Sequence, residues 1–141
     1  MANVIPYAFR GELFTGTHNF ASGGDSFKLA LYTANPYTTA STAYTATSEV
    51  SASGTNYTTT GNALTGNAVA YGTAVASCDF ADTEWTTATF TAAFGAIYND
   101  DQSDKLCVVL DFSGDKTATN GTFKITFPSP STPADAIISM A

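Results

Sequence analysis

The sequence predicts an all-β protein, organised as a single antiparallel β-sandwich or jelly-roll-like domain with a short N-terminal arm or helix. The chain is rich in threonine, tyrosine, phenylalanine and valine, which favour pleated sheets. Short segments alternate between apolar and polar residues, and clusters of turn-forming residues separate them. A length of 141 residues suits one domain. We therefore expect one domain over residues 1–141, with an arm and a turn in residues 1–24 and the sandwich in residues 25–141.

The N-terminal segment PYAFRGELF, residues 6–14, predicts a short helix. Pro6 fits the first turn of a helix, where its missing N–H costs nothing. Phe9 and Leu13 fall on one side of this helix at i, i+4 spacing. Gly16 is expected to end it, because glycine readily takes the backbone conformation that closes a helix.

The chain's only histidine, His18, lies in the stretch THNFASGGD between this helix and the first predicted strand. A catalytic group of His18 with Ser22 and Asp25 would need three side chains that meet in space, and the sequence contains no G-x-S-x-G turn for a nucleophile. A turn residue whose side chain hydrogen-bonds to the backbone explains His18 more simply. We therefore expect His18 to fix the approach of the chain to the sheet.

The segment SFKLALYT, residues 26–33, alternates with a period of two, which predicts a half-buried strand. Its two faces consist of Phe27, Leu29 and Leu31 on one side and Lys28, Ala30 and Tyr32 on the other. Residues 37–53 then show weak periodicity and predict a surface loop, with a short strand or turn near Glu49 and Val50.

The rest of the chain holds a series of predicted strands joined by hairpins. KLCVVLDF, residues 105–112, is apolar on both faces, which indicates a central strand covered on both sides. Residues 85–92 and 94–99 form either two strands or one long strand bent around Gly95. Further strands are expected at residues 57–64, 68–71, 75–80, 122–127 and 136–140. Turn residues predict hairpin connections at residues 99–104 and 113–121.

Charge and composition narrow the classes of partner. Charged residues make up only 12% of the chain, and the net charge is −7. The basic residues are scattered rather than clustered, whereas nucleic-acid binding needs a basic surface that displaces phosphate counterions. We therefore expect no direct nucleic-acid partner. The chain lacks an apolar run long enough to span a membrane, and its first residues lack the apolar core of a signal peptide.

Residues that could hold a metal or a cofactor are scarce. Cys78 and Cys107 stand outside any C-x-x-C or Cys/His cluster, so two buried thiols are expected, with a bridge between them left open. The acidic group Asp100, Asp101 and Asp104 could bind calcium, but it lacks the closing glutamate and fits a solvated hairpin tip better. The glycines at positions 61, 66 and 72 do not form a phosphate-binding loop. We expect no cofactor and no metal.

No catalytic residue is predicted either. Asp82 and Glu84 beside Trp85 only weakly suggest a glycosidase pair, because the distance between catalytic carboxyl groups is a property of the folded chain. Trp85 is expected to anchor the core. The absence of an activated nucleophile, together with low charge and a β-rich chain, favours a structural or binding protein over an enzyme.

Several segments resemble a family of small virion proteins of tailed bacteriophages. They are GTHNF, DSFKLALYT, FADTEWTTATFTAAFGAIYND and VVLDFSGDKTATNGTFKITFP, with the threonine-rich TTASTAYTATSEVSASGTNYTTTGNALT between them. The resemblance covers nearly the whole chain. It departs at Asn56 and around Thr60–Gly61, a region where the family favours glycines.

The resemblance implies a virion component without enzymatic activity, assembled in the host cytoplasm. Small all-β proteins on phage heads are often decoration, or cement, proteins, which bind the outer head surface and stabilise contacts between capsomers. The implied partner is the major capsid protein, and a homo-oligomer, a dimer or a trimer, is expected from the general preference for closed symmetry. The candidate interface residues are Tyr7, Phe9, Phe14, Tyr37, Tyr44 and Tyr57.

Three alternatives remain open at this stage. The tyrosines could instead cover the edges of the sandwich. The protein could belong to the tail, neck or fibres of the particle rather than to the head. A β-sandwich that binds carbohydrate through Trp85 and surface tyrosines is the alternative from another functional class.

Overall fold

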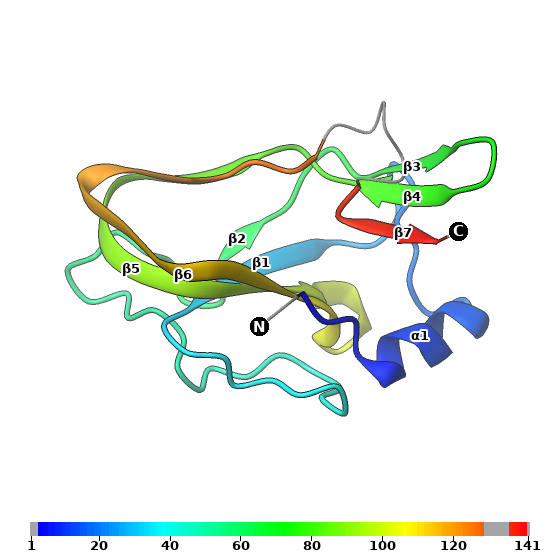
Figure 1. Ribbon diagram of the computed structural model, residues 1–141, viewed down its shortest axis with the longest axis horizontal. Helices are drawn as coiled ribbons and strands as arrows, with labels where there is room; N and C mark the ends of the chain where they lie inside the picture. Colours follow the sequence, from blue (N-terminus) through cyan, green and yellow to red (C-terminus); the bar gives the residue numbers. More distant parts are fainter. Residues whose placement is uncertain (1–2, 129–135, 141) are drawn as a thin grey trace.

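The computed structural model describes residues 3–128 and 136–140, which form two antiparallel sheets and one short helix (Figure 1). The larger sheet has four strands in the order β2-β1-β5-β6, and the smaller sheet has three in the order β3-β4-β7. Their bounds are β1 Phe27–Tyr32, β2 Asn62–Ala63, β3 Ala68–Tyr71, β4 Ala76–Asp79, β5 Thr83–Asn99, β6 Lys105–Ile125 and β7 Ile138–Met140. The prediction of a mostly β, antiparallel fold is confirmed. No helix in the described part of the chain is long and apolar enough to cross a membrane.

The predicted N-terminal helix is confirmed as α1, Tyr7–Phe14, with Pro6 at its N-cap. Phe9 is fully buried in the main core, and Leu13 packs against the same core. The helix ends where Gly16 takes a positive φ of 68° and its N–H bonds to the Leu13 carbonyl. Because Phe9 is part of the core, α1 is packed onto the body rather than extended as a free arm.

Strand β1 forms where alternation predicted it, but both of its faces are buried instead of one. Phe27, Leu29 and Leu31 face the main core. Ala30 and Tyr32, on the other face, belong to a second apolar cluster with Tyr37 and Tyr98. The expectation of a half-buried strand was therefore wrong, because another segment of the chain covers the second face.

That covering segment is the stretch predicted as a surface loop, residues 37–53. Isolated β-bridges join Ala43 to Lys105 and Glu49 to Tyr32, so both parts of the segment are fastened to the sheet. Val50, near which a short strand or turn was expected, is buried, and its N–H bonds to the Leu31 carbonyl. The segment is irregular and mostly exposed, as predicted, and its buried residues Tyr37 and Val50 make it also a lid over the sheet.

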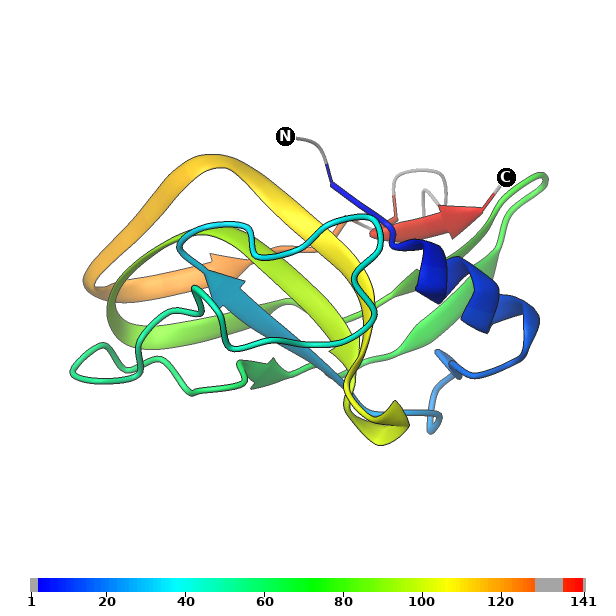
Figure 2. The ribbon, with the colours of Figure 1, turned by 90° about the horizontal axis from the view of Figure 1, so that it is seen from below.

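Strands β5 and β6 form one long hairpin that curves over the body (Figures 1 and 2). Residues 85–99 lie in one long strand, which was the second of the two predicted alternatives. The hairpin expected at residues 113–121 is absent: this stretch continues β6 and pairs with β5 from Thr91↔Thr117 to Ala88↔Gly121. The pairing register shifts at several places, among them between Ala92 and Phe94, and such bulges bend a strand.

The turn residues of this stretch therefore make bulges instead of a reversal. Ser113 and Gly114 both have positive φ, at 57° and 110°, and Asn120 has a φ of 47°. A single left-handed residue can open a bulge or close a turn, so composition alone does not distinguish the two. By contrast, the predicted connection at residues 99–104 is confirmed, with a 3₁₀ turn at Asp100–Gln102.

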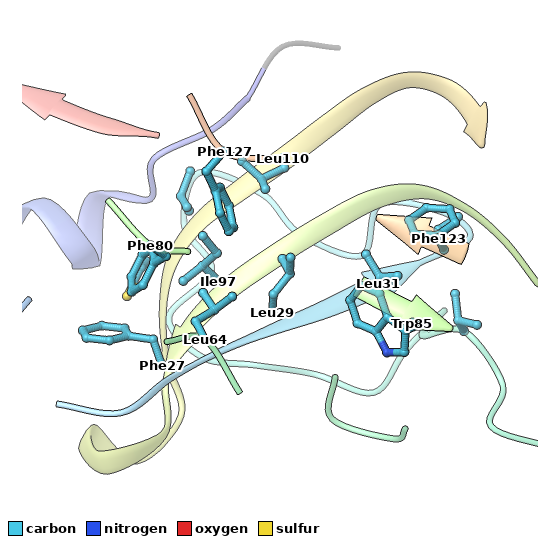
Figure 3. Close-up of a cluster of buried hydrophobic side chains, with 14 of the residues drawn as sticks. Phe27, Leu29, Leu31, Leu64, Phe80, Trp85, Ile97, Leu110, Phe123 and Phe127 are labelled. Atoms are coloured by element: carbon cyan, nitrogen blue, oxygen red, sulfur yellow. The ribbon is translucent and has the colours of Figure 1, made fainter. Parts of the chain in front are cut away.

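The long hairpin is curved, so that its far half, which holds the start of β5 and the end of β6, lies over its near half beside the Asp100–Gln102 turn. The two halves enclose the main core. In Figure 3, Trp85 and Phe123 lie beside Leu31, while Phe80 lies near Phe27. Trp85 is 3% exposed and Phe123 6%. Cys78 and Cys107 are both free and buried, as expected.

The short β2 shows how one close approach shapes the sheet. Only Asn62 and Ala63 of the strand expected at residues 57–64 pair with β1. Just before them, Thr60 and Gly61 have positive φ of 75° and 81°, which breaks the extended backbone. A Cβ on Gly61 would lie 1.9 Å from the Leu29 carbonyl oxygen, so only glycine permits this contact between the segments.

Candidate functional site

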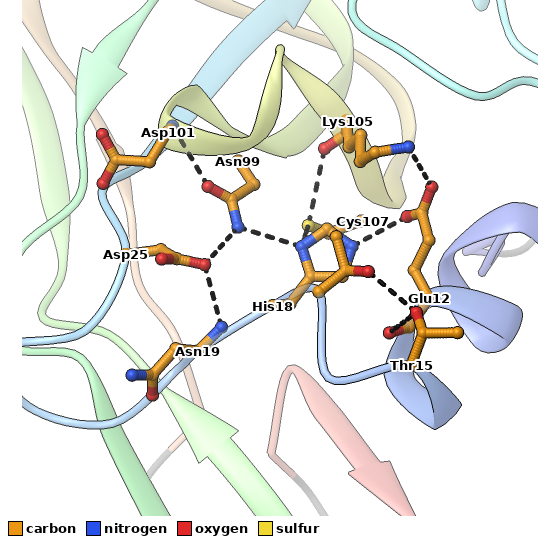
Figure 4. Close-up of polar contacts among 10 residues, drawn as sticks. Glu12, Thr15, His18, Asn19, Asp25, Asn99, Asp101, Lys105 and Cys107 are labelled. Atoms are coloured by element: carbon orange, nitrogen blue, oxygen red, sulfur yellow. Dashed lines mark hydrogen bonds and ion pairs between the residues drawn. The ribbon is translucent and has the colours of Figure 1, made fainter.

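His18 lies in a buried polar network that joins α1 to the sheet (Figure 4). Its Nε2 is 2.8 Å from a carboxylate oxygen of Glu12, and its Nδ1 is 2.9 Å from the Asn99 amide nitrogen. The same amide donates to the Asp25 carboxylate at 2.8 Å. The His18 side chain has no exposed surface. Hydrogen bonds from His18 to the backbone had been expected, but its bonds run to side chains instead. They connect the helix, the loop before β1 and the end of β5.

Hydrogen bonding fixes the protonation pattern of this network. The Asn99 side-chain oxygen accepts the backbone N–H of Asp101 at 3.1 Å, which leaves the amide N–H groups to face His18 and Asp25. Nδ1 of His18 is therefore an acceptor, and Nε2 carries the proton donated to Glu12. A neutral imidazole satisfies every one of these partners.

Glu12 is held between two donors. One oxygen accepts from His18 and the other from the Lys105 ammonium at 2.7 Å. Burial alone would raise the pKa of Glu12, but the hydrogen bonds from Lys105 and His18 and the charge of Lys105 outweigh it and hold the pKa below its ordinary value of 4.5. Glu12 is thus a stable carboxylate that fastens the helix to the start of β6.

Cys107 lies beside this network, with Sγ 4.0 Å from Nδ1 of His18. Cysteine, histidine and asparagine are also the side chains of some catalytic thiol sites. Those sites need an accessible thiolate with a lowered pKa. Here Cys107 is fully buried, and burial first, then the nearby Cys78 thiol, raises its pKa well above the ordinary range. Ser22, the other candidate nucleophile, is exposed on the loop. The geometry favours the structural interpretation of His18.

The acidic tip of the β5–β6 turn is used for internal contacts. Asp100 pairs with Lys28 at 3.0 Å, and Asp101 accepts the backbone N–H of Ser26 at 2.7 Å. Within residues 3–128 and 136–140, no group of three or more histidine, cysteine or acidic side chains is arranged to hold a metal. These carboxylates fasten the turn to the start of β1.

Half of the candidate interface residues are buried inside the chain. Phe9 is 0% exposed, Tyr37 7% and Tyr57 4%, so the expectation that they present contact surface was wrong. Phe9 anchors α1 to the core, Tyr37 lies in the apolar cluster under the lid, and Tyr57 packs in the main core. Tyr44 is half-buried, with its ring 4.8 Å from that of Tyr98.

A single carboxylate explains why Tyr44 and Tyr57 point inward. Glu49 accepts hydrogen bonds from the Tyr44 hydroxyl at 2.6 Å, the Tyr57 hydroxyl at 2.8 Å and the Thr60 N–H at 2.8 Å. A buried tyrosine needs a partner for its hydroxyl, and Glu49 supplies one. The amphipathic tyrosines therefore act as core residues with polar ends.

Trp85 is buried, in agreement with its predicted role as a core anchor. Its ring stacks on Tyr57 at 5.8 Å and meets Phe90 and Phe123 edge-on. Asp82 pairs with Lys124 at 3.1 Å and accepts the Phe127 N–H. A carbohydrate platform built on Trp85 therefore loses its main support.

The exposed large apolar side chains gather mainly at one end of the molecule. Phe14 is 93% exposed, Tyr71 84%, Met140 57% and Val69 40%. They lie on the last turn of α1, on β3 and on β7, and Figures 1 and 2 show these elements at the same end of the body. We call these four residues the apolar end. Tyr7, the fifth exposed large apolar side chain among the described residues, lies at the start of α1 with the Arg10 guanidinium over its ring.

A groove runs between α1 and the smaller sheet at this end. Its volume is about 110 Å³, and it is lined almost wholly by apolar atoms. The lining residues are Phe9, Leu13, Phe20, Val69, Ala76, Ser77, Cys78, Ile138, Ser139 and Met140. Pairing of Val69 with Cys78 and of Cys78 with Ile138 places one apolar row across the sheet beneath the helix.

A larger open hollow, about 540 Å³, lies along the outer half of β6. Its lining mixes polar and apolar residues and includes Lys116 and Lys124. Lys124 is already paired with Asp82. The apolar end is the better candidate for binding, because uncovered apolar surface gains more from a partner than a hydrated, mixed surface does.

Two of the predicted interface residues, Tyr7 and Phe14, are exposed, and only Phe14 belongs to the apolar end. Val69, Tyr71 and Met140 were missed. A signal existed: residues 65–78 carry no charged side chain in an acidic chain. What sequence could not show is that β3 lies at the edge of its sheet.

Comparison with known proteins adds no relative: no family model matches the chain, and neither a curated protein nor a solved structure matches it.

Proposed function

We propose that this protein is a non-enzymatic structural protein of a tailed-phage particle, most specifically a decoration protein that binds the outer head surface. The observation that carries the proposal is the apolar end, where Phe14, Tyr71 and Met140 are uncovered on an otherwise well-packed body. The side chains that are able to take part in catalysis, Glu12, His18 and Cys107, contact one another inside the fold. Such a division suits a protein that grips a partner.

The body has the stiffness that a clamp requires. We infer that the two sheets and the curved β5–β6 hairpin make up a β-sandwich, in which the far half of the hairpin faces β1 across the core. The aromatic contacts among Trp85, Phe90 and Phe123 fill the space between the layers. A close-packed interior transmits force between its surfaces rather than absorbing it.

The occupant proposed for the groove and for Phe14 and Met140 is the major capsid protein. Sites for small molecules usually have volumes of roughly 300–1,000 Å³. The groove, at about 110 Å³, suits one or two side chains of a protein partner. None of the four residues of the apolar end is charged, as expected of the dry centre of a lasting protein interface. Many copies on one particle would multiply a modest contact.

A tail, neck or fibre protein is the second candidate, supported by the same uncovered surface. Electron cryomicroscopy of purified particles distinguishes the two by the location of the density. Density on the outer head surface, with α1 and β7 facing the shell, is the expected result. Density on the tail would replace the decoration assignment, and absence of the protein from purified particles would overturn the proposal.

A binding assay tests the surface itself. Phe14→Lys places a charge on a side chain that contributes almost nothing to the core, so the fold is expected to remain intact. Binding to particles that lack the protein should fall at least tenfold. Tyr7→Lys, on the same helix and also exposed, is the matched control and should bind as the wild type does. Equal binding by all three proteins would exclude the apolar end as the contact.

A further inference from the structure

We infer that β3 is a pairing edge for a second copy of this chain, so that two copies join their three-stranded sheets into one continuous sheet. The inference concerns the free protein and does not depend on a role in a virion. It rests on the position of β3, the direction of its backbone groups and the distribution of charge.

Strand β3 lies at the edge of its sheet, with β4 on one side only. The Gly72 N–H bonds to the Val75 carbonyl at 2.7 Å. In an antiparallel ladder, hydrogen-bonded pairs alternate with non-bonded ones. The continuous register therefore makes Ala70↔Ser77 a bonded pair and turns the N–H and C=O groups of Val69 and Tyr71 outward. Among the described residues, no strand pairs with this outer edge.

The edge carries no charge, proline or bulge to block pairing. Natural edge strands are protected by charged residues, prolines or bulges. Residues 65–78 contain neither a charged residue nor a proline, and the register of β3 with β4 has no shift. The exposed side chains that flank the outward backbone groups, Val69 and Tyr71, are apolar.

A second copy of the chain fits this edge in both charge and symmetry. Each chain has a net charge of −7, so two copies repel one another over most of their surface. They can approach closely only through a neutral region, and residues 65–78 are such a region. A strand also complements itself, because antiparallel pairing with its own copy follows a twofold axis.

The outward groups fix the register of this pairing. With the twofold axis at Ala70, Val69 lies opposite Tyr71 of the second copy, and Tyr71 lies opposite its Val69. Both are bonded pairs, so every outward group of the two residues gains a partner. The two Ala70 residues form the central non-bonded pair. Each exposed tyrosine packs beside a valine, a cross-strand combination that stabilises sheets.

Sedimentation velocity over a wide range of protein concentration tests the inference. The wild type should pass from monomer to dimer, without a trimer. Tyr71→Lys introduces a charge at the edge, and Val69→Pro removes one outward N–H where an edge strand tolerates proline. Both variants should remain monomeric. Tyr7→Lys, at an exposed residue that lies at the start of α1 and outside the apolar end, is the control and should dimerise as the wild type does.

Two results would overturn the inference. One is a wild type that stays monomeric at every concentration. The other is a dimer that persists in Tyr71→Lys at wild-type strength, which would assign the contact to another surface. Circular dichroism of each variant checks that loss of the dimer is not loss of the fold. In a wild-type dimer mixed from ¹³C-labelled and unlabelled chains, an isotope-filtered nuclear Overhauser effect between the two Ala70 Hα protons is expected, and its absence from a formed dimer would refute the register.

Discussion

Glu12 connects three parts of the chain through one carboxylate. It lies on α1, it accepts from His18 in the following loop, and it accepts from Lys105 at the start of β6. Its side chain is 14% exposed, so water replaces these bonds poorly. The position of the helix therefore depends on the protonation state of the Glu12 carboxyl group.

The lowered pKa of Glu12 has a definite consequence for stability. Its folded pKa lies below 4.5, so the unfolded chain binds the proton more tightly. The stabilisation is complete above pH 4.5 and is lost as the pH falls through the lowered folded pKa. In Glu12→Gln, the free energy of unfolding, measured by urea titration at a series of pH values, should depend less steeply on pH in this window.

Other carboxylates also contribute to the dependence of stability on pH. Backbone or side-chain hydrogen bonds also lower the pKa values of Asp25, Asp82 and Asp111. In Glu12→Gln, the free energy of unfolding should therefore still depend on pH, with a smaller slope than in the wild type. A variant with the same slope as the wild type between pH 4.5 and the acid transition would show that Glu12 is not coupled to folding.

Single residues also mark where sequence reasoning reached its limit. The predicted role of Trp85 as a core anchor is confirmed by its 3% exposure, whereas Phe9, expected at an interface, is fully buried. Tyr37 and Tyr57 were expected on the surface, because tyrosine is common at interfaces. Whether a tyrosine is buried depends on a distant partner, here Glu49 for Tyr57, and local pattern carries no information about it.

Elements with strong local signals were predictable, and elements defined by distant pairing were not. Alternation located β1, and turn residues located the Asp100–Gln102 connection. The stretch 113–121 contains the same kinds of turn residue, yet it continues β6, because its pairing with β5 outweighs local preference. The apolar end was missed for the same reason: the edge position of β3 is a property of the whole sheet.

Two neighbouring residues before β2 allow a test at this scale. Thr60 has a φ of 75°, which is strained for a β-branched residue, while its N–H and C=O bond to Glu49 and Tyr98. Thr60→Gly keeps both backbone bonds and removes the strain. It should raise the free energy of unfolding by up to about 1 kcal/mol.

The opposite kind of substitution at the next position should lower the free energy of unfolding. Gly61→Ala places a Cβ 1.9 Å from the Leu29 carbonyl oxygen and forces β2 away from β1. We expect a loss of about 3 kcal/mol or more, comparable with other severe steric changes. Chemical denaturation of the two variants beside the wild type measures both effects. A stable Gly61→Ala protein would show that β2 does not need this close approach.

At the scale of the molecule, charge and apolar surface are separated. The carboxylates are distributed over the body, whereas Val69, Tyr71, Phe14 and Met140 gather at one end without a charge among them. If β3 pairs two copies, the dimer presents two sets of α1 and β7 surfaces. A decoration protein with two such surfaces could hold neighbouring capsid subunits together, which one surface could not do.

The same separation predicts how salt affects the dimer. Two chains with a net charge of −7 repel one another, and the repulsion is not offset by ion pairs at β3, since residues 65–78 carry no charge. Salt screens such repulsion, because the screening length falls from roughly 10 Å at 0.1 M to roughly 3 Å at 1 M. Sodium chloride should therefore increase the dimer fraction measured by sedimentation velocity. An interface built on ion pairs would respond in the opposite way, so dissociation in high salt would place the contact between copies somewhere other than the β3 edge.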